Sequence, residues 1–144
     1  MDSTKLEIIH KHYEAFNRGD MEGAARFFSE SITYKDQARG LTLAGPEQVK
    51  AGLGEWKQAF SDARHIEIDH IDAGDSIVSR SVGRGTNDGP FGPLPPTGRT
   101  VSFPLCEVWE FDGDGRIVRG EIYYDQLSVL TQLGHIPATE PAGV

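Results

Sequence analysis

The chain has 144 residues, of which 14 are basic and 22 acidic, and its formal net charge is −8. This length corresponds to one domain that can bury a core without disulfides. The acidic balance, with no basic stripe, argues against nucleic acid and anionic membranes as partners. Cys106 is the only cysteine, which excludes an internal disulfide and a CxxC metal site. No apolar run approaches about 18 residues and the N-terminus lacks an apolar leader, so we expect a cytoplasmic protein.

Hydrophobic spacing predicts two helices and one strand in the first third of the chain. A helix over residues 4–18 has an apolar stripe that includes Tyr13, and a short helix over 21–29 follows it. Alternating side chains predict a strand over 31–36. The polar residues 37–44 then predict a loop.

A third helix and four strands are expected in the rest of the chain. Pro46 suits the first turn of a helix whose apolar stripe includes Trp56. Residues 87–98 contain four prolines and three glycines, which predicts a stiff loop with Phe91 at its tip, and 136–144 read as a frayed tail. The strands are expected over 65–72, 76–86, 99–111 and 116–124, and a last helix over 126–133.

Helices that precede a run of antiparallel strands are typical of the α+β class. A sheet with one face against helices must curve over them. We therefore expect a curved antiparallel sheet wrapped over three N-terminal helices, a cone-shaped α+β barrel with an interior. Neither a repeat nor a long linker divides the chain, so residues 1–144 are predicted to form a single domain.

The hairpin at Asp112-Gly113-Asp114-Gly115 predicts the register of the last two strands. A type I turn followed by a left-handed Gly115 places Asp112 opposite Arg116. With that register Glu107 faces Glu121, and both side chains project from the same side of the sheet. The other residues on that side of the first strand are apolar, namely Val101, Phe103, Leu105, Trp109 and Phe111.

Two carboxylates at cross-strand distance in apolar surroundings repel each other and are poorly solvated, and both effects raise a pKa. One glutamate would then hold a proton near neutral pH while the other stays ionised, as a general acid and a general base require. A structural interpretation stays open, in which a nearby arginine such as Arg119 neutralises one glutamate. A slip of one residue would also place Glu107 and Glu121 on opposite faces.

Several other side chains have two open interpretations. Asp36 ends its strand on the inward side and is either a third catalytic carboxylate or a cap of the following loop. His70 alternates with Ile66 and Ile68 and is either a pocket group or a structural histidine. The five histidines lack metal-ligand spacing, so we expect no metal. The aromatic residues expected either to line the pocket or to fill the core are Tyr13, Tyr34, Trp56, Trp109 and Tyr123, with Phe91 covering the pocket mouth.

With these residues in place, the sequence resembles the SnoaL-like polyketide cyclases, also called ester cyclases, of the superfamily named for nuclear transport factor 2. The resemblance implies one deep pocket, a homodimer, and an aldol cyclisation of a polyketide ester without metal or organic cofactor. By position, the family's catalytic histidine and aspartate correspond to Glu107 and Glu121, so both groups differ from the family pattern. The matching segments span most of the chain: 13–20, 34–36, 89–99, 114–118, 123–127 and 132–134.

We therefore expect a cofactor-free enzyme that acts on a hydrophobic small molecule bearing a carbonyl group. Glu121 would be the base that removes a proton next to the carbonyl, and protonated Glu107 would hydrogen-bond the developing enolate oxygen. Two alternatives stay open because one fold hosts many functions. An epoxide hydrolase or epoxide-opening cyclase would use the same carboxylates with help from Asp36. A binding protein would use the pocket without chemistry.

Overall fold

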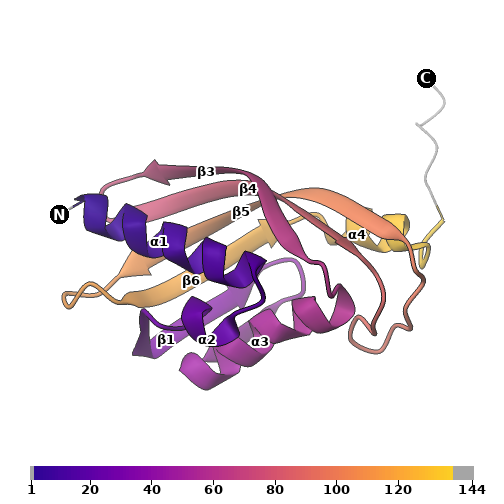
Figure 1. Cartoon of the computed structure of the whole chain (residues 1–144), viewed down its shortest axis with the longest axis horizontal. Coiled ribbons are helices and arrows are strands. Elements are labelled where there is room, and N and C mark those ends of the chain that lie inside the picture. Colours follow the sequence, from indigo (N-terminus) through magenta and orange to yellow (C-terminus); the bar gives the residue numbers. More distant parts are fainter. Residues whose placement is uncertain (1, 138–144) are drawn as a thin grey trace.

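The structure, a computed structural model, describes residues 2–137. These residues form a curved six-stranded sheet and four helices (Figure 1). The strand order is β2–β1–β6–β5–β4–β3, so β2 and β3 are edges and the sheet does not close into a barrel. The α+β class is confirmed. Of the expected tail, residues 138–144 lie outside the described residues.

The first half of the chain contains two elements that differ from the prediction. The expected helix over 21–29 ends after one turn because Phe28 joins the sheet beside Ile117, and the expected loop over 37–44 contains a short edge strand. Asp20 caps this short helix by accepting a hydrogen bond from the Gly23 amide at 2.8 Å. The elements are α1 (Asp2–Asn17), α2 (Met21–Ala24), β1 (Phe28–Asp36), β2 (Leu41–Ala44) and α3 (Pro46–Ala59).

The second half follows the predicted order closely, and each expected strand is present within one residue of its expected start. The elements are β3 (Arg64–Asp72), β4 (Ser76–Thr86), β5 (Thr100–Phe111), β6 (Ile117–Tyr124) and α4 (Gln126–Leu133).

One pairing corrects the expectation of a purely antiparallel sheet. Strand β1 runs parallel to β6, although all other pairs are antiparallel.

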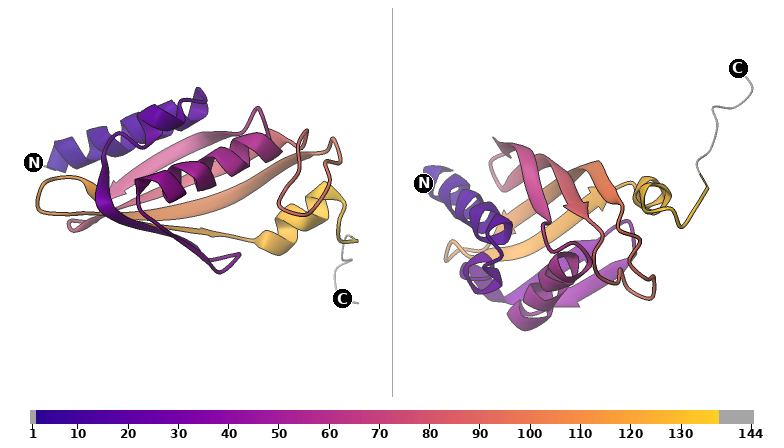
Figure 2. Two further views of the ribbon diagram at one scale, coloured as in Figure 1. Left: turned by 90° about the horizontal axis from the view of Figure 1, so that it is seen from below. Right: turned by 45° about the vertical axis from the view of Figure 1, so that its right-hand side comes forward.

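The concave face of the sheet and the helices enclose the core. Helix α1 packs against β3 and β4, and α3 packs against β1 and β2, while α4 lies at the far end of β5 (Figure 2). No helix among residues 2–137 is long and apolar enough to cross a membrane. The largest fully buried side chains include Trp109, Tyr13, Phe60, Ile9, Ile32 and Ile77.

Two β-bulges decide which side chains face the core. In β3 the register shifts between Ile66 and Asp69, where Glu67 has a φ of 52°. In β6 the register shifts next to Val118, because Phe111 pairs with Ile117 but Glu110 pairs with Arg119. Each bulge inserts one extra residue and so reverses the alternation beyond it.

Candidate active site

Glu107 lies on the concave face of β5 and is only 3% exposed. Its two carboxyl oxygens each accept a hydrogen bond from a tyrosine. The hydroxyl of Tyr13 on α1 donates to Oε1 at 2.5 Å, and the hydroxyl of Tyr34 on β1 donates to Oε2 at 2.5 Å. Two elements from the first quarter of the chain therefore hold the buried carboxyl of β5 between them.

Burial raises the pKa of Glu107 to about 7, because the charged form has lost its water. The hydrogen bonds from Tyr13 and Tyr34 act in the opposite direction, since they favour the ionised carboxylate. Near neutral pH the group therefore populates both protonation states. A carboxyl with this pKa is suited to take up and release a proton during a reaction.

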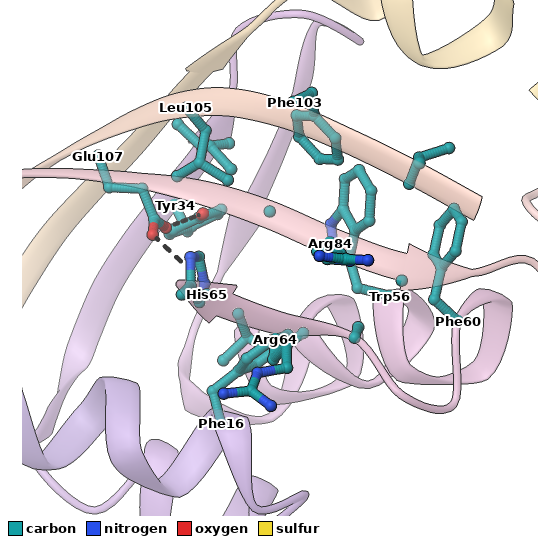
Figure 3. A pocket seen from close by; sticks show the side chains of 16 residues that line it. Phe16, Tyr34, Trp56, Phe60, Arg64, His65, Arg84, Phe103, Leu105 and Glu107 are labelled. Carbon is teal, nitrogen blue, oxygen red and sulfur yellow. Dashed lines mark hydrogen bonds and ion pairs between the residues drawn. The ribbon is translucent and has the colours of Figure 1, made fainter. Parts of the chain in front are cut away.

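His65 is the second titratable group beside this carboxyl. Its Nε2 lies 4.0 Å from Glu107 Oε1 (Figure 3). Its Nδ1 lies 2.8 Å from the Ser81 hydroxyl. Burial lowers the pKa of His65 to about 3, so the imidazole is neutral near pH 7. The sequence analysis missed His65, because strict alternation in β3 does not include the bulge at Glu67.

An apolar pocket extends from Glu107 toward α3 and the ends of β4 and β5 (Figure 3). Glu107, Tyr34 and His65 are the groups at its inner end that carry hydrogen-bonding side chains. The cavity measures about 50 Å³, which is room for a few waters but not for a polycyclic molecule. Its apolar lining includes Phe16, Leu53, Trp56, Phe60, Phe103 and Leu105.

The proline-rich loop after β4 packs against part of this lining. Phe91 is buried, and its ring centroid lies 5.3 Å from that of Trp56 and 5.9 Å from that of Phe60. The base of the loop is fixed by fully buried Asn87, whose amide nitrogen donates to the Ala59 carbonyl at 3.1 Å. Phe91 thus packs against two residues of the pocket lining, and its role in covering the pocket mouth stays a prediction.

Asp36 is buried on the concave face but is already fully paired. Its carboxylate accepts hydrogen bonds from Arg39 Nε at 2.7 Å, from the Arg39 amide at 3.0 Å and from the Tyr124 hydroxyl at 3.0 Å. The Arg39 guanidinium lies 5.2 Å from the Trp56 ring centroid. The contact with the Arg39 amide is that of a cap of the loop after β1, and a catalytic role for Asp36 stays a prediction.

The expected pairing of Glu107 with Glu121 is wrong. The predicted turn is present, with the Asp112 amide donating to the Arg116 carbonyl at 2.9 Å, but the bulge at Val118 shifts the register beyond it. Glu107 therefore faces Ile122, and Glu121 lies on the convex face. There hydrogen bonds from Tyr123 and Gln37, together with Arg119, lower the pKa of Glu121.

The same bulge corrects the expectation for Tyr123. Its side chain is 45% exposed on the convex face, where its hydroxyl donates to Glu121 at 2.8 Å, so it does not line the pocket. Its neighbour Tyr124 points inward instead and contacts Asp36 and the rings of Trp56 and Phe103.

Three further aromatic side chains lie behind the pocket rather than in it. Trp109 is fully buried and packs edge-on against His12 at 4.9 Å between centroids. Tyr13 reaches the site only through its hydroxyl. His70 faces inward, but it packs edge-on against Tyr13, and its Nδ1 lies 2.8 Å from the Ser79 hydroxyl. Ile66 does not share its face, because the bulge at Glu67 lies between them.

Comparison with solved structures identifies the class of fold. AclR of Streptomyces galilaeus superposes with a TM-score of 0.82 at 23% identity, covering 97% of this chain and 87% of that one. A Catenulispora acidiphila protein with a ketosteroid isomerase-like fold gives a TM-score of 0.78 at 22% identity, covering 94% and 98% of the two chains. The molecule therefore has the curved-sheet fold of nuclear-transport-factor-2-like proteins.

The family follows from the sequence comparison. The family model for SnoaL-like polyketide cyclases matches residues 7–133. The chain is 28% identical over 143 residues to the aklanonic acid methyl ester cyclase DnrD of Streptomyces peucetius, covering 98% of this chain and 97% of that protein. It is 27% identical to the aklanonic acid methyl ester cyclase DauD of Streptomyces sp. strain C5, covering 98% and 88%. The chain belongs to the SnoaL-like polyketide cyclase family.

Proposed function

We propose that the protein is a cofactor-free cyclase of polyketide-type esters in which Glu107 alone transfers the proton. Ionised Glu107 takes a proton from the carbon next to a carbonyl, and the electron pair of that C–H bond forms an enolate. The enolate carbon then attacks a second carbonyl of the same molecule, and protonated Glu107 returns the proton to the resulting alkoxide. The observation that carries this proposal is a buried carboxyl, with a pKa of about 7, at the inner end of an apolar pocket.

Tyr34 and His65 are placed to assist this reaction because they line the pocket beside Glu107. When Glu107 becomes protonated, it becomes a weaker acceptor of the hydrogen bond from the Tyr34 hydroxyl. That hydroxyl can then donate to the enolate oxygen instead. Neutral His65 has a comparable role if the Ser81 hydroxyl donates to Nδ1, since Nε2 then carries a proton that faces the site. Both donors stabilise negative charge as it develops.

The substrate class follows from the apolar lining and from the relatives. DnrD and DauD are named for a methyl ester, a group without charge that suits an apolar pocket. A polycyclic ester exceeds the cavity of about 50 Å³, so we infer that the Phe91 loop moves away from Trp56 to widen the pocket and admit it. The closed loop would then keep water from the enolate.

The test uses aklanonic acid methyl ester as the substrate and compares two glutamate variants. Glu107→Gln should reduce the rate of cyclisation by about 10³-fold, because an amide cannot accept the proton. Glu121→Gln is the matched control on the convex face and should retain the wild-type rate. Product formation is followed by mass spectrometry and chromatography.

Two outcomes would contradict the proposal. A wild-type rate in Glu107→Gln would show that Glu107 does not carry the proton. Turnover of an epoxide panel by the wild-type protein, without turnover of β-keto esters, would assign the pocket to epoxide opening instead.

A further inference from the structure

A second space, here called the outer hollow, adjoins the pocket that leads to Glu107. It measures about 250 Å³ and lies between the loop after β1, the last turns of α3 and the proline-rich loop. The last two segments run side by side (Figure 2), and the Gly89 amide donates to the Ala59 carbonyl between them. Because Trp56 lines both the pocket and the outer hollow, its side chain is a wall between them. The polar side chains of the outer hollow are those of Arg39, Glu55 and Gln58, and its aromatic ones are Trp56 and Phe91.

Arg39 presents hydrogen-bond donors to the outer hollow from a fixed position. Its Nε donates to Asp36 at 2.7 Å, and its guanidinium lies 5.2 Å from the Trp56 ring centroid and 5.6 Å from that of Phe91. Among residues 2–137 the guanidinium hydrogen-bonds through Nε, which leaves N–H groups of its terminal nitrogens to donate. A donor that is already held in place loses little conformational entropy when a ligand binds.

The charges around Arg39 favour an uncharged ligand over an anion. Asp36 offsets the guanidinium charge at 2.7 Å, and Tyr124 holds the same carboxylate at 3.0 Å. Glu55 adds a negative charge to the lining, and Gln58, one turn further along α3, adds none. An anion in the outer hollow would therefore be repelled by Glu55. A carbonyl oxygen accepts hydrogen bonds from Arg39 without this repulsion.

We propose that the outer hollow is a substrate subsite that binds a planar, uncharged ring carrying a carbonyl group, whose oxygen accepts a hydrogen bond from Arg39. The inference rests on the proposed function, because it assigns the outer hollow to the end of the substrate away from the reacting carbon. The rings of Trp56 and Phe91 favour a planar ring as the ligand.

The size of the two spaces supports their joint use. Small-molecule sites usually measure about 300–1,000 Å³, and neither the pocket nor the outer hollow alone reaches this range. Once the Phe91 loop has moved away from Trp56, the two spaces join. One substrate would then extend from Glu107 to Arg39.

The experiment measures binding rather than turnover, with three probes of nearly the same shape. Fluorene is a planar ring system without oxygen, 9-fluorenone adds a carbonyl group, and 9-fluorenone-2-carboxylate adds a negative charge. The dissociation constant of each probe is measured by equilibrium dialysis for wild type and for each variant. Each probe is compared only with itself, so differences in probe hydrophobicity cancel.

Replacing Arg39 tests the carbonyl contact. Arg39→Lys should weaken the binding of 9-fluorenone by roughly tenfold, because lysine still pairs with Asp36 but lacks the planar set of donors. The same variant should leave the binding of fluorene unchanged, which also shows that the fold and the aromatic walls are intact. Arg26→Lys is the matched control, since the Arg26 guanidinium lies 5.8 Å from the Phe27 ring, outside the lining, and it should change neither affinity.

Replacing Glu55 tests the preference for an uncharged ligand. Glu55→Gln should raise the affinity for 9-fluorenone-2-carboxylate by roughly threefold and leave that for 9-fluorenone unchanged. Glu47→Gln removes the same charge from the first turn of α3 and should change neither affinity.

Three results would overturn the proposal. The first is unchanged binding of 9-fluorenone in Arg39→Lys. The second is equal weakening of fluorene and 9-fluorenone in that variant, which would mean that Arg39 only supports the contact between Trp56 and Phe91. The third is an unchanged affinity of Glu55→Gln for the carboxylate. A wild-type cyclisation rate in Glu107→Gln would overturn the proposed function instead, and it would leave these probe affinities as they are measured.

Discussion

Tyr13 and Tyr34 oppose the effect of burial on the proton affinity of Glu107. Burial raises the pKa of this carboxyl, and the two hydroxyls lower it by hydrogen-bonding its ionised form. The result is a pKa of about 7 instead of the ordinary 4.5. Each tyrosine therefore adjusts the acidity of the site, even though only Tyr34 lines the pocket.

Removing one of these hydroxyls should make Glu107 a weaker acid. In Tyr34→Phe the carboxylate loses a donor, so its pKa should rise by about one unit above the wild-type value. The measurement is a pH titration of the ¹³C carboxyl resonance of Glu107. Tyr123→Phe is the matched control, because it removes a hydroxyl that contacts Glu121 on the convex face. An unchanged or lower pKa in Tyr34→Phe would show that this hydrogen bond does not stabilise the ionised form.

At the level of single residues, sequence reasoning found the carboxyl and named Tyr13 and Tyr34 among the pocket aromatics, but it did not predict that they hydrogen-bond Glu107. Glu107 could be identified because every other inward residue of its strand is apolar. Glu121 and Tyr123 were placed on the wrong face because a bulge inside a strand leaves no signal in the alternation beside it. His65 was missed for the same reason. Its position beside Glu107 could not be predicted from periodicity.

Strand β6 shows how a single element sets the geometry of the site. Beyond its bulge Gly120 faces inward, and a Cβ atom there would come within 2.6 Å of the Trp109 ring and 2.7 Å of the Tyr34 ring. Glycine is therefore required by the close approach of two aromatic side chains. Because Tyr34 also hydrogen-bonds Glu107, its close approach to Gly120 sets the distance between the Tyr34 hydroxyl and the Glu107 carboxyl.

Substituting Gly120 should affect both stability and the site. Gly120→Ala forces Trp109 or Tyr34 to shift, and overpacking of this kind costs about 1–3 kcal/mol of the free energy of unfolding. Urea denaturation measures that loss. Gly113→Ala, in the hairpin turn with open space around the added carbon, is the control and should stay within about 0.5 kcal/mol of wild type. Equal stability of both variants would contradict the crowding seen around Gly120.

The order of elements was predicted well because hydrophobic periodicity changes clearly from helical to alternating. The errors lie where a short segment depends on tertiary pairing. The strand β2 has only four residues and no buried side chain, so its sequence resembles a loop. Strand β1 begins earlier than expected because its parallel pairing with β6, rather than local propensity, extends it.

For the whole molecule, the buried titratable groups predict an optimum pH of stability. The pKa of Glu107 is raised to about 7, so between about 4.5 and 7 the folded protein binds more protons there than the unfolded chain, and this contribution falls as pH rises. The pKa values of His12 and His65 are lowered to about 4 and about 3. Their contributions fall as pH drops below about 6.5, because the unfolded chain protonates first.

The melting temperature should therefore be highest between about pH 6 and 7. Below this range, the stability lost because two histidines stay unprotonated in the fold exceeds the stability gained at one glutamate. Just above it, only the glutamate still changes its protonation, and its contribution to stability falls. Glu107→Gln removes the buried charge. The difference in the free energy of unfolding between this variant and wild type should therefore shift in favour of the variant by up to about 3 kcal/mol from pH 4 to pH 8. Calorimetry across this pH range checks both statements. A wild-type melting temperature that rises steadily from pH 6 to 8, without a matching change in Glu107→Gln, would contradict the assignment.

The homodimer implied by the resemblance stays a prediction.

The parallel pairing of β1 with β6 has a consequence for how the protein reaches its active form. The hydrogen bonds to Glu107 span 94 residues of sequence from Tyr13 and 73 from Tyr34. Contacts between such distant segments close large loops and are slow to form. On the ribosome, the carboxyl cannot lose its water until β6 has been synthesised and has docked beside β1. The unusual acidity of this side chain would thus arise late in folding, and its titration would report when the chain has completed its fold.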